Sequence, residues 1–283
     1  MEKILIIDLG SRYGDEVIRY VRRFKVLAEA VSLENAARRA SECECKGIII
    51  TGDDEKMPDA VNEEIFSLSV PVLGIGAGAA AVAEAFGGEV RPAERLGETA
   101  LFADNSCTLL ASLPAKSACN ISFGGQISRV PTGFRITAKA TGCPVAAIEN
   151  AKTGVYALAF RPEKTEQFLS VLKNFLYDIC SCHAEWTSAS FLRRTSSALK
   201  ERIAGHRVIC MLDGSPEATC NALLLHRAVE GALSCIFVNS GLLRKGEAEY
   251  IRGTFSSLCG PNFSELDASD RGKRHINDNP RSP

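Results

Sequence analysis

The stretch that decides the fold is Pro71-Val72-Leu73-Gly74-Ile75-Gly76-Ala77-Gly78. Residues 70–75 form a short apolar run, and residues 77–86 form an alanine-rich segment that ends at Gly87-Gly88. A continuous apolar run is typical of a strand in a parallel sheet that is covered on both faces. The stretch therefore predicts a buried strand that turns directly into a helix.

The same alternation of strands and helices extends to both sides of this stretch. Before it, residues 3–8 and 46–50 are apolar runs that predict strands, and residues 15–24 have helical spacing. After it, we predict strands at 89–91, 99–102, 136–140, 145–149 and 155–160, followed by an amphipathic helix at 163–177. This order predicts a doubly wound, flavodoxin-like α/β domain over residues 1–181, which is a normal size for one domain.

A second, smaller α/β unit is predicted in the rest of the chain. Residues 182–206 form a linker with a polar helix at 190–203. Residues 207–212 and 234–238 then predict strands, and residues 219–229 and 247–258 predict helices. We assign residues 207–271 to a partial parallel α/β unit. Residues 272–283 are polar and without periodicity, so we expect a disordered tail.

The charge of the chain is nearly balanced, with 33 basic and 34 acidic side chains. Proteins that bind nucleic acids or membrane surfaces usually carry clusters of Lys and Arg, so neither partner is expected. No apolar run reaches the ~18 residues that a membrane span needs. The N-terminus enters a strand at once and lacks a signal peptide, so we expect a cytoplasmic protein.

The 11 cysteines are scattered along the chain, and in the cytosol they should stay reduced. Two groups, Cys43-x-Cys45 and Cys180-x-Cys182-His183, contain metal-ligating residue types. Their spacing differs from that of the common Cys-x-x-Cys zinc knuckles, and a four-ligand site would need both groups to meet in space. We therefore expect no metal, and we interpret several of the cysteines as small buried apolar side chains.

Four segments, in order, resemble one known family. Ile7-Asp8-Leu9-Gly10-Ser11-Arg12-Tyr13 resembles the opening strand and turn of GMP synthases. The stretch 71–78 resembles the nucleophile elbow of class I glutamine amidotransferases, and Phe160-Arg161-Pro162-Glu163 resembles their His-Pro-Glu segment. Cys143-Pro144-Val145-Ala146-Ala147-Ile148-Glu149-Asn150 is similar to GMP synthase in particular. The resemblance to glutamine-hydrolysing GMP synthase covers residues 1–271, which correspond to only part of the full-length enzyme.

The resemblance implies a catalytic triad that this sequence lacks. In the family, a cysteine at the strand-to-helix turn attacks the side-chain amide of glutamine, a histidine supports its thiolate, and a glutamate orients the histidine. The cysteine position is Gly76, the histidine position is Arg161, and only Glu163 matches. Glycine has no nucleophile, and a guanidinium cannot act as a general base near neutral pH. Arg161 either pairs with Glu163 or holds an anionic ligand.

The resemblance also implies a vestigial oxyanion and glutamine site at Gly52, Asp53, Gly78 and Ala80. The family turn Ser-Gly-Gly-Pro is Thr51-Gly52-Asp53-Asp54 here, and a carboxylate at this turn would oppose a developing oxyanion. Ala80 stands at the position of a family glutamine, and Phe123-Gly124-Gly125 replaces a family His-Gly-Asp. We therefore expect an altered pocket.

The second unit resembles the start of the ATP-pyrophosphatase domain of GMP synthase. The family loop Ser-Gly-Gly-Val-Asp-Ser-Ser binds pyrophosphate through backbone N–H groups at a helix N-terminus. The matching segment here is Asp213-Gly214-Ser215-Pro216-Glu217-Ala218-Thr219. Pro216 removes an N–H donor, and Asp213 adds a negative charge where phosphate should sit. We interpret this segment as a vestigial ATP loop formed by Asp213, Gly214, Ser215, Glu217 and Thr219.

The family is a glutamine-dependent ligase of GMP biosynthesis that converts XMP to GMP with glutamine and ATP. Because the nucleophile, the base and the phosphate loop are all altered, we expect this chain to be inactive at both sites, as a pseudoenzyme or truncated copy, with no cofactor. The alternative is a functional GMP synthase or subunit, which would use ATP and magnesium. The partial second unit predicts an exposed strand edge along residues 234–238. Either this unit is loosely folded and prone to aggregate, or a protein partner covers it.

Overall fold

The computed structural model describes residues 2–10, 14–52, 61, 63–161, 166–229 and 231–269. The contacts between residues divide the chain into two compact units, Met1–Trp186 and Thr187–Pro283, and each is described by itself. No helix in the described part of the chain is long and apolar enough to span a membrane.

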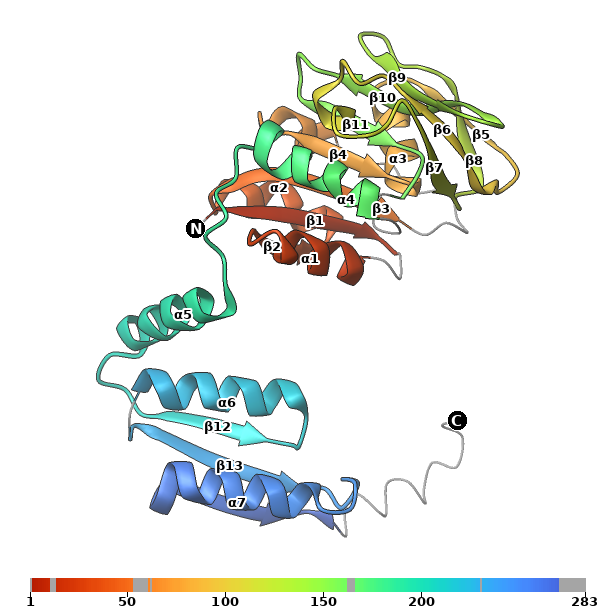
Figure 1. The fold of residues 1–283 in the computed structure, drawn as a ribbon. Helices are drawn as coiled ribbons and strands as arrows, with labels where there is room; N and C mark the ends of the chain where they lie inside the picture. The colour runs from red at the N-terminus through yellow and green to blue at the C-terminus, as the bar shows by residue number, and fades with distance from the viewer. Residues whose placement is uncertain are drawn as a thin grey trace. The chain divides into compact units, whose positions relative to one another are not determined.

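The first unit is built around one large sheet (Figure 1). The strands of the first unit are β1 (Lys3–Leu9), β2 (Leu27–Val31), β3 (Cys45–Gly52), β4 (Val72–Ile75), β5 (Glu89–Pro92), β6 (Gly97–Ala103), β7 (Lys116–Ile121), β8 (Gly125–Arg129), β9 (Arg135–Ala140), β10 (Cys143–Asn150) and β11 (Val155–Leu158). The large sheet has the order β2-β1-β3-β4-β11-β10-β9-β6-β7, and β5 pairs with β8 as a separate antiparallel ribbon. Strands from β2 to β11 pair in parallel, and strands from β11 to β7 pair antiparallel.

Helices cover both faces of the parallel part of this sheet. They are α1 (Gly14–Arg23), α2 (Leu33–Ser41), α3 (Ala77–Ala85), α4 (Glu166–Lys173) and the π-helical η4 (Asn174–Ile179), with short 3-10 turns η1 (Glu63–Ser67) and η2 (Thr108–Leu110). In β1, Ile4 and Ile6 pack in the same apolar cluster as α1, whereas Leu5 and Ile7 pack in the cluster of α2 and α3. Both faces of the strand are buried, which explains its continuous apolar run. The predicted doubly wound α/β fold is confirmed.

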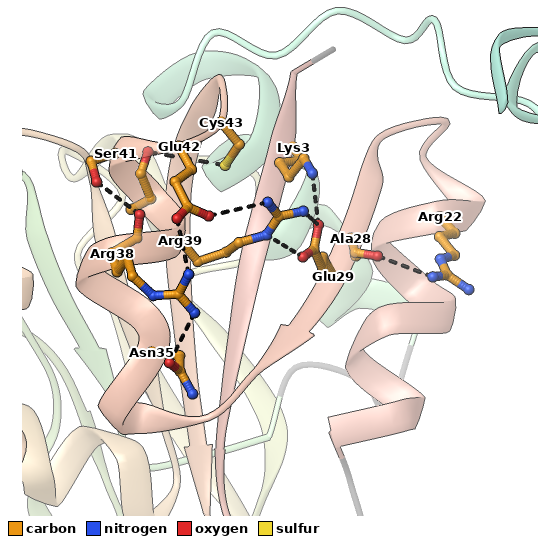
Figure 2. A network of polar contacts seen from close by, with 11 residues as sticks. Lys3, Arg22, Ala28, Glu29, Asn35, Arg38, Arg39, Ser41, Glu42 and Cys43 are labelled. Atoms are coloured by element: carbon orange, nitrogen blue, oxygen red, sulfur yellow. Dashed lines mark hydrogen bonds and ion pairs between the residues drawn. The ribbon is translucent and has the colours of Figure 1, made fainter. Parts of the chain in front are cut away.

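The sequence patterns do not predict β2, α2, β7 or β8. In β2, the charge of Glu29 interrupts the apolar pattern at the edge of the sheet. Glu29 accepts hydrogen bonds from Nζ of Lys3 and Nε of Arg39, both at 2.6 Å (Figure 2). Lys3 belongs to β1 and Arg39 to α2, so the Glu29 carboxylate links β2 to both neighbouring elements. The same charge interrupts the apolar pattern from which β2 could have been predicted.

The second unit is a three-stranded parallel sheet with helices. Its elements are α5 (Ser188–Ile203), β12 (Val208–Leu212), α6 (Pro216–Val229), β13 (Leu233–Asn239), α7 (Glu247–Cys259), the 3-10 turn η5 (Gly260–Asn262) and β14 (Phe263–Asp267). The two predicted strands and the predicted helices are present. The strand order is β12-β13-β14, so β13 is the central strand. The prediction that residues 234–238 form an exposed edge is therefore wrong, because β14, whose polar pattern concealed it, pairs with β13.

One face of this second sheet is uncovered by the described residues. Side chains of both α6 and α7 pack in one cluster with Cys235 and Phe237 of β13, so the two helices lie on the same face. On the opposite face, Ile209 and Met211 of β12 are each 68% exposed. We call this surface the uncovered sheet face; it consists of Ile209, Met211, Ser234, Ile236, Val238, Ser264 and Leu266. None of these side chains is charged.

Candidate functional site

The strand-to-helix turn at Gly76 keeps the backbone shape of a nucleophile elbow. Gly76 has φ 59° and ψ −119°, a region that residues with side chains rarely adopt. Its N–H donates to the carbonyl oxygen of Leu158 at 2.8 Å, and its carbonyl accepts from the N–H of Ala79 at 3.0 Å. The turn is thus fixed between β11 and the first turn of α3. In nucleophile elbows this strained turn presents the reacting side chain, and here the position has none.

Three glycines allow α3 to approach the sheet closely. A Cβ atom at Gly78 would lie 2.0 Å from the carbonyl oxygen of Ile50 in β3, and one at Gly74 would lie 2.5 Å from the carbonyl oxygen of Gly78. A Cβ atom at Gly52 would lie 3.0 Å from Cβ of Ala77. Gly78, predicted as a site residue, is therefore required by packing whether or not the site binds anything, and a side chain at Gly52 would be tight against Ala77.

Phe123 occupies the apolar side of the elbow. Its side chain is buried and packs against Ala77 and Ala80, the positions after the elbow glycine and at the family glutamine. A Cβ atom at Gly125 would lie 2.5 Å from the ring, so the glycine leaves room for it. Where the sequence predicts an altered pocket, the aromatic ring of Phe123 packs on Ala77 and Ala80.

Arg161 is buried and bonds to the residue that precedes Phe123. It is 2% exposed, its Nε donates to Oγ of Ser122 at 3.0 Å, and its backbone N–H donates to the carbonyl of Asn120 at 3.2 Å. Ser122 precedes Phe123, so the Arg161 side chain and the elbow meet the same segment between β7 and β8. A buried guanidinium remains a cation and cannot accept a proton. Glu163 and Asp53, the other predicted site residues of the first unit, lie outside the described residues.

Cys45 and Cys182 come from the two cysteine groups of the sequence, and Cys182 is buried. Burial raises the pKa of Cys45 to about 11 and that of Cys182 to about 12, so these thiols stay protonated near neutral pH. Cys43 lies near Arg39 (Figure 2), and it is close enough to Cys45 to raise the pKa of that thiol. Within the described residues, no group of three or more His, Cys, Asp or Glu side chains could hold a metal ion.

In the loop between β12 and α6, the carboxylate of Asp213 is hydrogen-bonded by donors of the loop itself. Oδ1 of Asp213 accepts hydrogen bonds from the N–H of Ser215 at 2.9 Å and from its hydroxyl at 2.7 Å, and these bonds lower the pKa of Asp213. Oγ of Ser215 accepts from the N–H of Ala218 at 3.2 Å, and the hydroxyl of Thr219 donates to the carbonyl of Ser215. Pro216 begins α6, and Glu217 follows it at the surface. An anion arriving at this helix N-terminus would meet a carboxylate already bonded to the loop's donors.

Gly214 adopts the positive φ that this loop needs to turn. Its φ of +94° suits glycine, and a Cβ atom there would lie 2.3 Å from the side chain of Leu243. The predicted residues of the second unit share one loop. In the first unit, Gly52, Gly76, Gly78 and Ala80 lie where α3 meets the sheet, and Arg161 bonds to Ser122, next to the Phe123 that packs on Ala80. Sequence reasoning missed Ser122, the hydroxyl that accepts from Arg161. Its position beside the altered Phe123 segment was the only signal.

The fold and the elbow define a class of proteins. A family model of class I glutamine amidotransferases matches residues 5–179, more than half of the chain, and the chain belongs to this family. Within it, the chain is homologous to glutamine-hydrolysing GMP synthases. It is 34% identical over 278 residues to that of Alkaliphilus metalliredigens and 35% identical over 277 residues to that of Carboxydothermus hydrogenoformans.

These alignments cover 95% of this chain but 54% of each relative, so the chain spans about half the length of the relatives it matches. Two solved structures show the fold. A Thermoplasma acidophilum protein assigned to GMP synthase as one of its subunits has a TM-score of 0.55 at 22% identity, covering 69% of this chain and 98% of its own. PurLQS from Thermotoga maritima has a TM-score of 0.51 at 15% identity, covering 63% and 99%.

Proposed function

We propose that this chain is a non-catalytic, cytoplasmic homologue of GMP synthase that retains the amidotransferase scaffold without glutaminase activity. The observation that carries the proposal is Gly76, which keeps the elbow backbone but offers no nucleophile. Two further observations support it. Arg161 is a buried cation at the position of the family base, and Phe123 packs on the alanines that line the elbow.

A glutaminase assay tests this proposal directly. We expect purified full-length chain to release no glutamate from glutamine above a no-enzyme control, with or without ATP, magnesium and XMP. Glutamate release that persists after the accessible cysteines are blocked with iodoacetamide would contradict the proposal most strongly, since an exposed thiol could not then be the nucleophile. A GMP synthase with an intact triad, assayed in parallel, shows that the conditions support turnover.

The loop of the second unit supports inactivity at the ATP site as well. The carboxylate of Asp213 bonds to the N–H and hydroxyl of Ser215, and Pro216 lacks an N–H. We expect no release of pyrophosphate from ATP in the presence of magnesium and XMP. The alternative function, an active GMP synthase or subunit that converts XMP to GMP with glutamine and ATP, rests on the overall homology. Steady pyrophosphate release coupled to GMP formation would establish that alternative.

We further infer that a second polypeptide with an uncharged apolar surface covers the uncovered sheet face. None of its seven residues is charged, and Ile209 and Met211 are each 68% exposed. Exposed apolar patches of this kind mark interaction surfaces. The homologous GMP synthases also contain polypeptide with no match in this chain, because the alignments cover 54% of their length.

Paired variants test this partner. We expect the chain isolated from its own cells to carry a bound protein that the Ile209→Lys/Met211→Lys variant releases. Tyr250→Lys is the matched control, because Tyr250 is 71% exposed on α7, away from that face. A monomeric full-length chain whose solubility and hydrogen exchange are the same in all three forms would contradict the inference.

A further inference from the structure

The second unit contains a groove between α5 and α6 that the proposed function does not use. A cavity of about 450 Å³ lies at the C-terminal ends of the two helices and is lined in part by Lys200 and Ala228. A second cavity of about 200 Å³ shares these two residues and extends along α5 to Arg193. Together they form the α5–α6 groove, whose volume is in the range of small-molecule sites.

The groove gathers positive charge. Arg193 and Lys200 of α5 and Arg227 of α6 line it, as does Arg207, and no described lining residue is acidic. Arg193, Lys200 and Arg227 form no ion pair or side-chain hydrogen bond in the described part of the chain. Residues 193, 196, 197 and 200 share one face of α5 because they are three or four positions apart. The groove therefore attracts an anion.

A buried hydroxyl lies among these cations. Ser196 is 9% exposed and lines the smaller cavity, and its Oγ has no hydrogen-bond partner among the described residues. A buried hydroxyl without a partner destabilises the protein, whereas nearly all buried polar groups in proteins are paired. An oxygen of a bound anion would supply the acceptor that Ser196 lacks.

Apolar side chains form the floor of the larger cavity, with Ile203, Val229 and Ala232 as its main members. Residues 205–207 and 232 precede β12 and β13, so this cavity lies at the amino ends of those strands. The loop of Asp213 follows β12 at its carboxyl end. The α5–α6 groove is therefore separate from the vestigial ATP loop.

We propose that the α5–α6 groove binds a phosphate monoester. The phosphate oxygens accept hydrogen bonds from Arg193, Lys200 and the hydroxyl of Ser196, and the organic body of the ligand rests on the apolar floor. The helix dipoles by themselves would favour Lys200 and Arg227, which lie in the last turns of their helices. They do not account for Arg193 in the middle of α5 or for the unpartnered Ser196.

Calorimetric titration of the full-length chain tests this site with ribose 5-phosphate, inorganic phosphate and ribose as probes. We expect saturable binding of ribose 5-phosphate with a dissociation constant below about 1 mM, weaker binding of inorganic phosphate, and no heat with ribose. The Arg193→Ala/Lys200→Ala variant should bind at least about tenfold more weakly. The Arg202→Ala/Lys245→Ala variant removes the same charge away from the groove and should bind normally.

Ser196→Ala separates a ligand site from a folding role. We expect several-fold weaker binding of ribose 5-phosphate and an unfolding temperature of the free protein that is equal or higher, because the hydroxyl has no partner to lose. Equal affinities for phosphate and ribose 5-phosphate, an equal loss in the control variant, or no saturable binding would overturn the proposal. The result is independent of glutaminase activity, which this titration does not measure.

Discussion

At the scale of single residues, the backbone at Gly76 disfavours any side chain, including a nucleophilic one. With φ 59° and ψ −119°, any side chain at this position is strained. We expect Gly76→Cys to lower the free energy of unfolding by about 1–3 kcal/mol, measured by denaturant titration. We also expect no glutamate release from this variant, because Arg161 cannot accept the thiol proton.

Two companion variants complete this test. Gly76→Ala introduces the same backbone strain without a thiol, so it should be destabilised to the same extent as Gly76→Cys. The Gly76→Cys/Arg161→His variant restores both groups, and we expect a trace of glutaminase activity from it. Full turnover by Gly76→Cys alone would show that the base position is dispensable.

At the scale of elements, the contact of α3 with β3 depends on Gly78. A Cβ atom there would lie 2.0 Å from the carbonyl oxygen of Ile50, a backbone atom that cannot move aside. We expect Gly78→Ala to destabilise the first unit by about 3 kcal/mol or more, seen as faster hydrogen exchange of α3 amides. At Gly253, inside α7, an added Cβ atom would meet nothing within 4 Å. Gly253→Ala should therefore stabilise α7 by about 0.5–1 kcal/mol, seen as slower hydrogen exchange of its amides. Equal effects of the two substitutions would contradict this packing argument.

The contact between Glu2 and the segment after η4 predicts a pH dependence. The Glu2 carboxylate accepts the backbone N–H of His183 at 2.9 Å and lies 3.2 Å from Nζ of Lys46. Burial raises the pKa of Glu2, but the bonds from His183 and Lys46 outweigh it and lower that pKa from 4.5 to about 2. A lowered carboxyl pKa stabilises the folded state above the unfolded pKa, and this stability is lost as the pH falls toward 2.

We therefore expect the wild-type chain to lose about 1 kcal/mol from this contact between pH 4.5 and 2, less than the pKa change alone would give, because water screens the pair. Glu2→Gln removes the titrating group and should flatten this part of the stability curve. The measurement is the unfolding temperature of both proteins across this pH range. Parallel curves would show that Glu2 does not contribute.

At the scale of the whole molecule, the division into two units predicts where the chain is cut. The division falls between Trp186 and Thr187, and Thr187 caps α5 by accepting the N–H of Ser190 at 3.0 Å. We expect limited proteolysis with a protease of broad specificity to cut within residues 182–205, first ahead of α5. A resistant N-terminal fragment of roughly 180 residues should remain, the size of a self-sufficient domain. Equal protection of the full-length chain in both units would contradict this.

Strong local patterns allowed much of the fold to be predicted. The run from Ile4 to Ile7 is apolar at every position because both faces of β1 are buried, so it indicated a strand unambiguously. Glu29 in β2 and Glu265 in β14 interrupt such a pattern, so the sequence did not predict these two strands. Each carboxylate is paired with an arginine from a neighbouring helix, Arg39 or Arg252, and such long-range pairing leaves no local signal.

The sequence by itself determined the family scaffold. It also determined that position 76 has no nucleophilic side chain and that position 161 carries a cation, because the residue type alone sets this chemistry. Only the tertiary structure decided that Phe123 packs on Ala77 and Ala80 and that Asp213 bonds the donors of its own loop. It also decided that α6 and α7 cover the same sheet face and that Ser196 lies buried among cations. These features depend on which distant segments meet, and that is set by the packing of the whole chain.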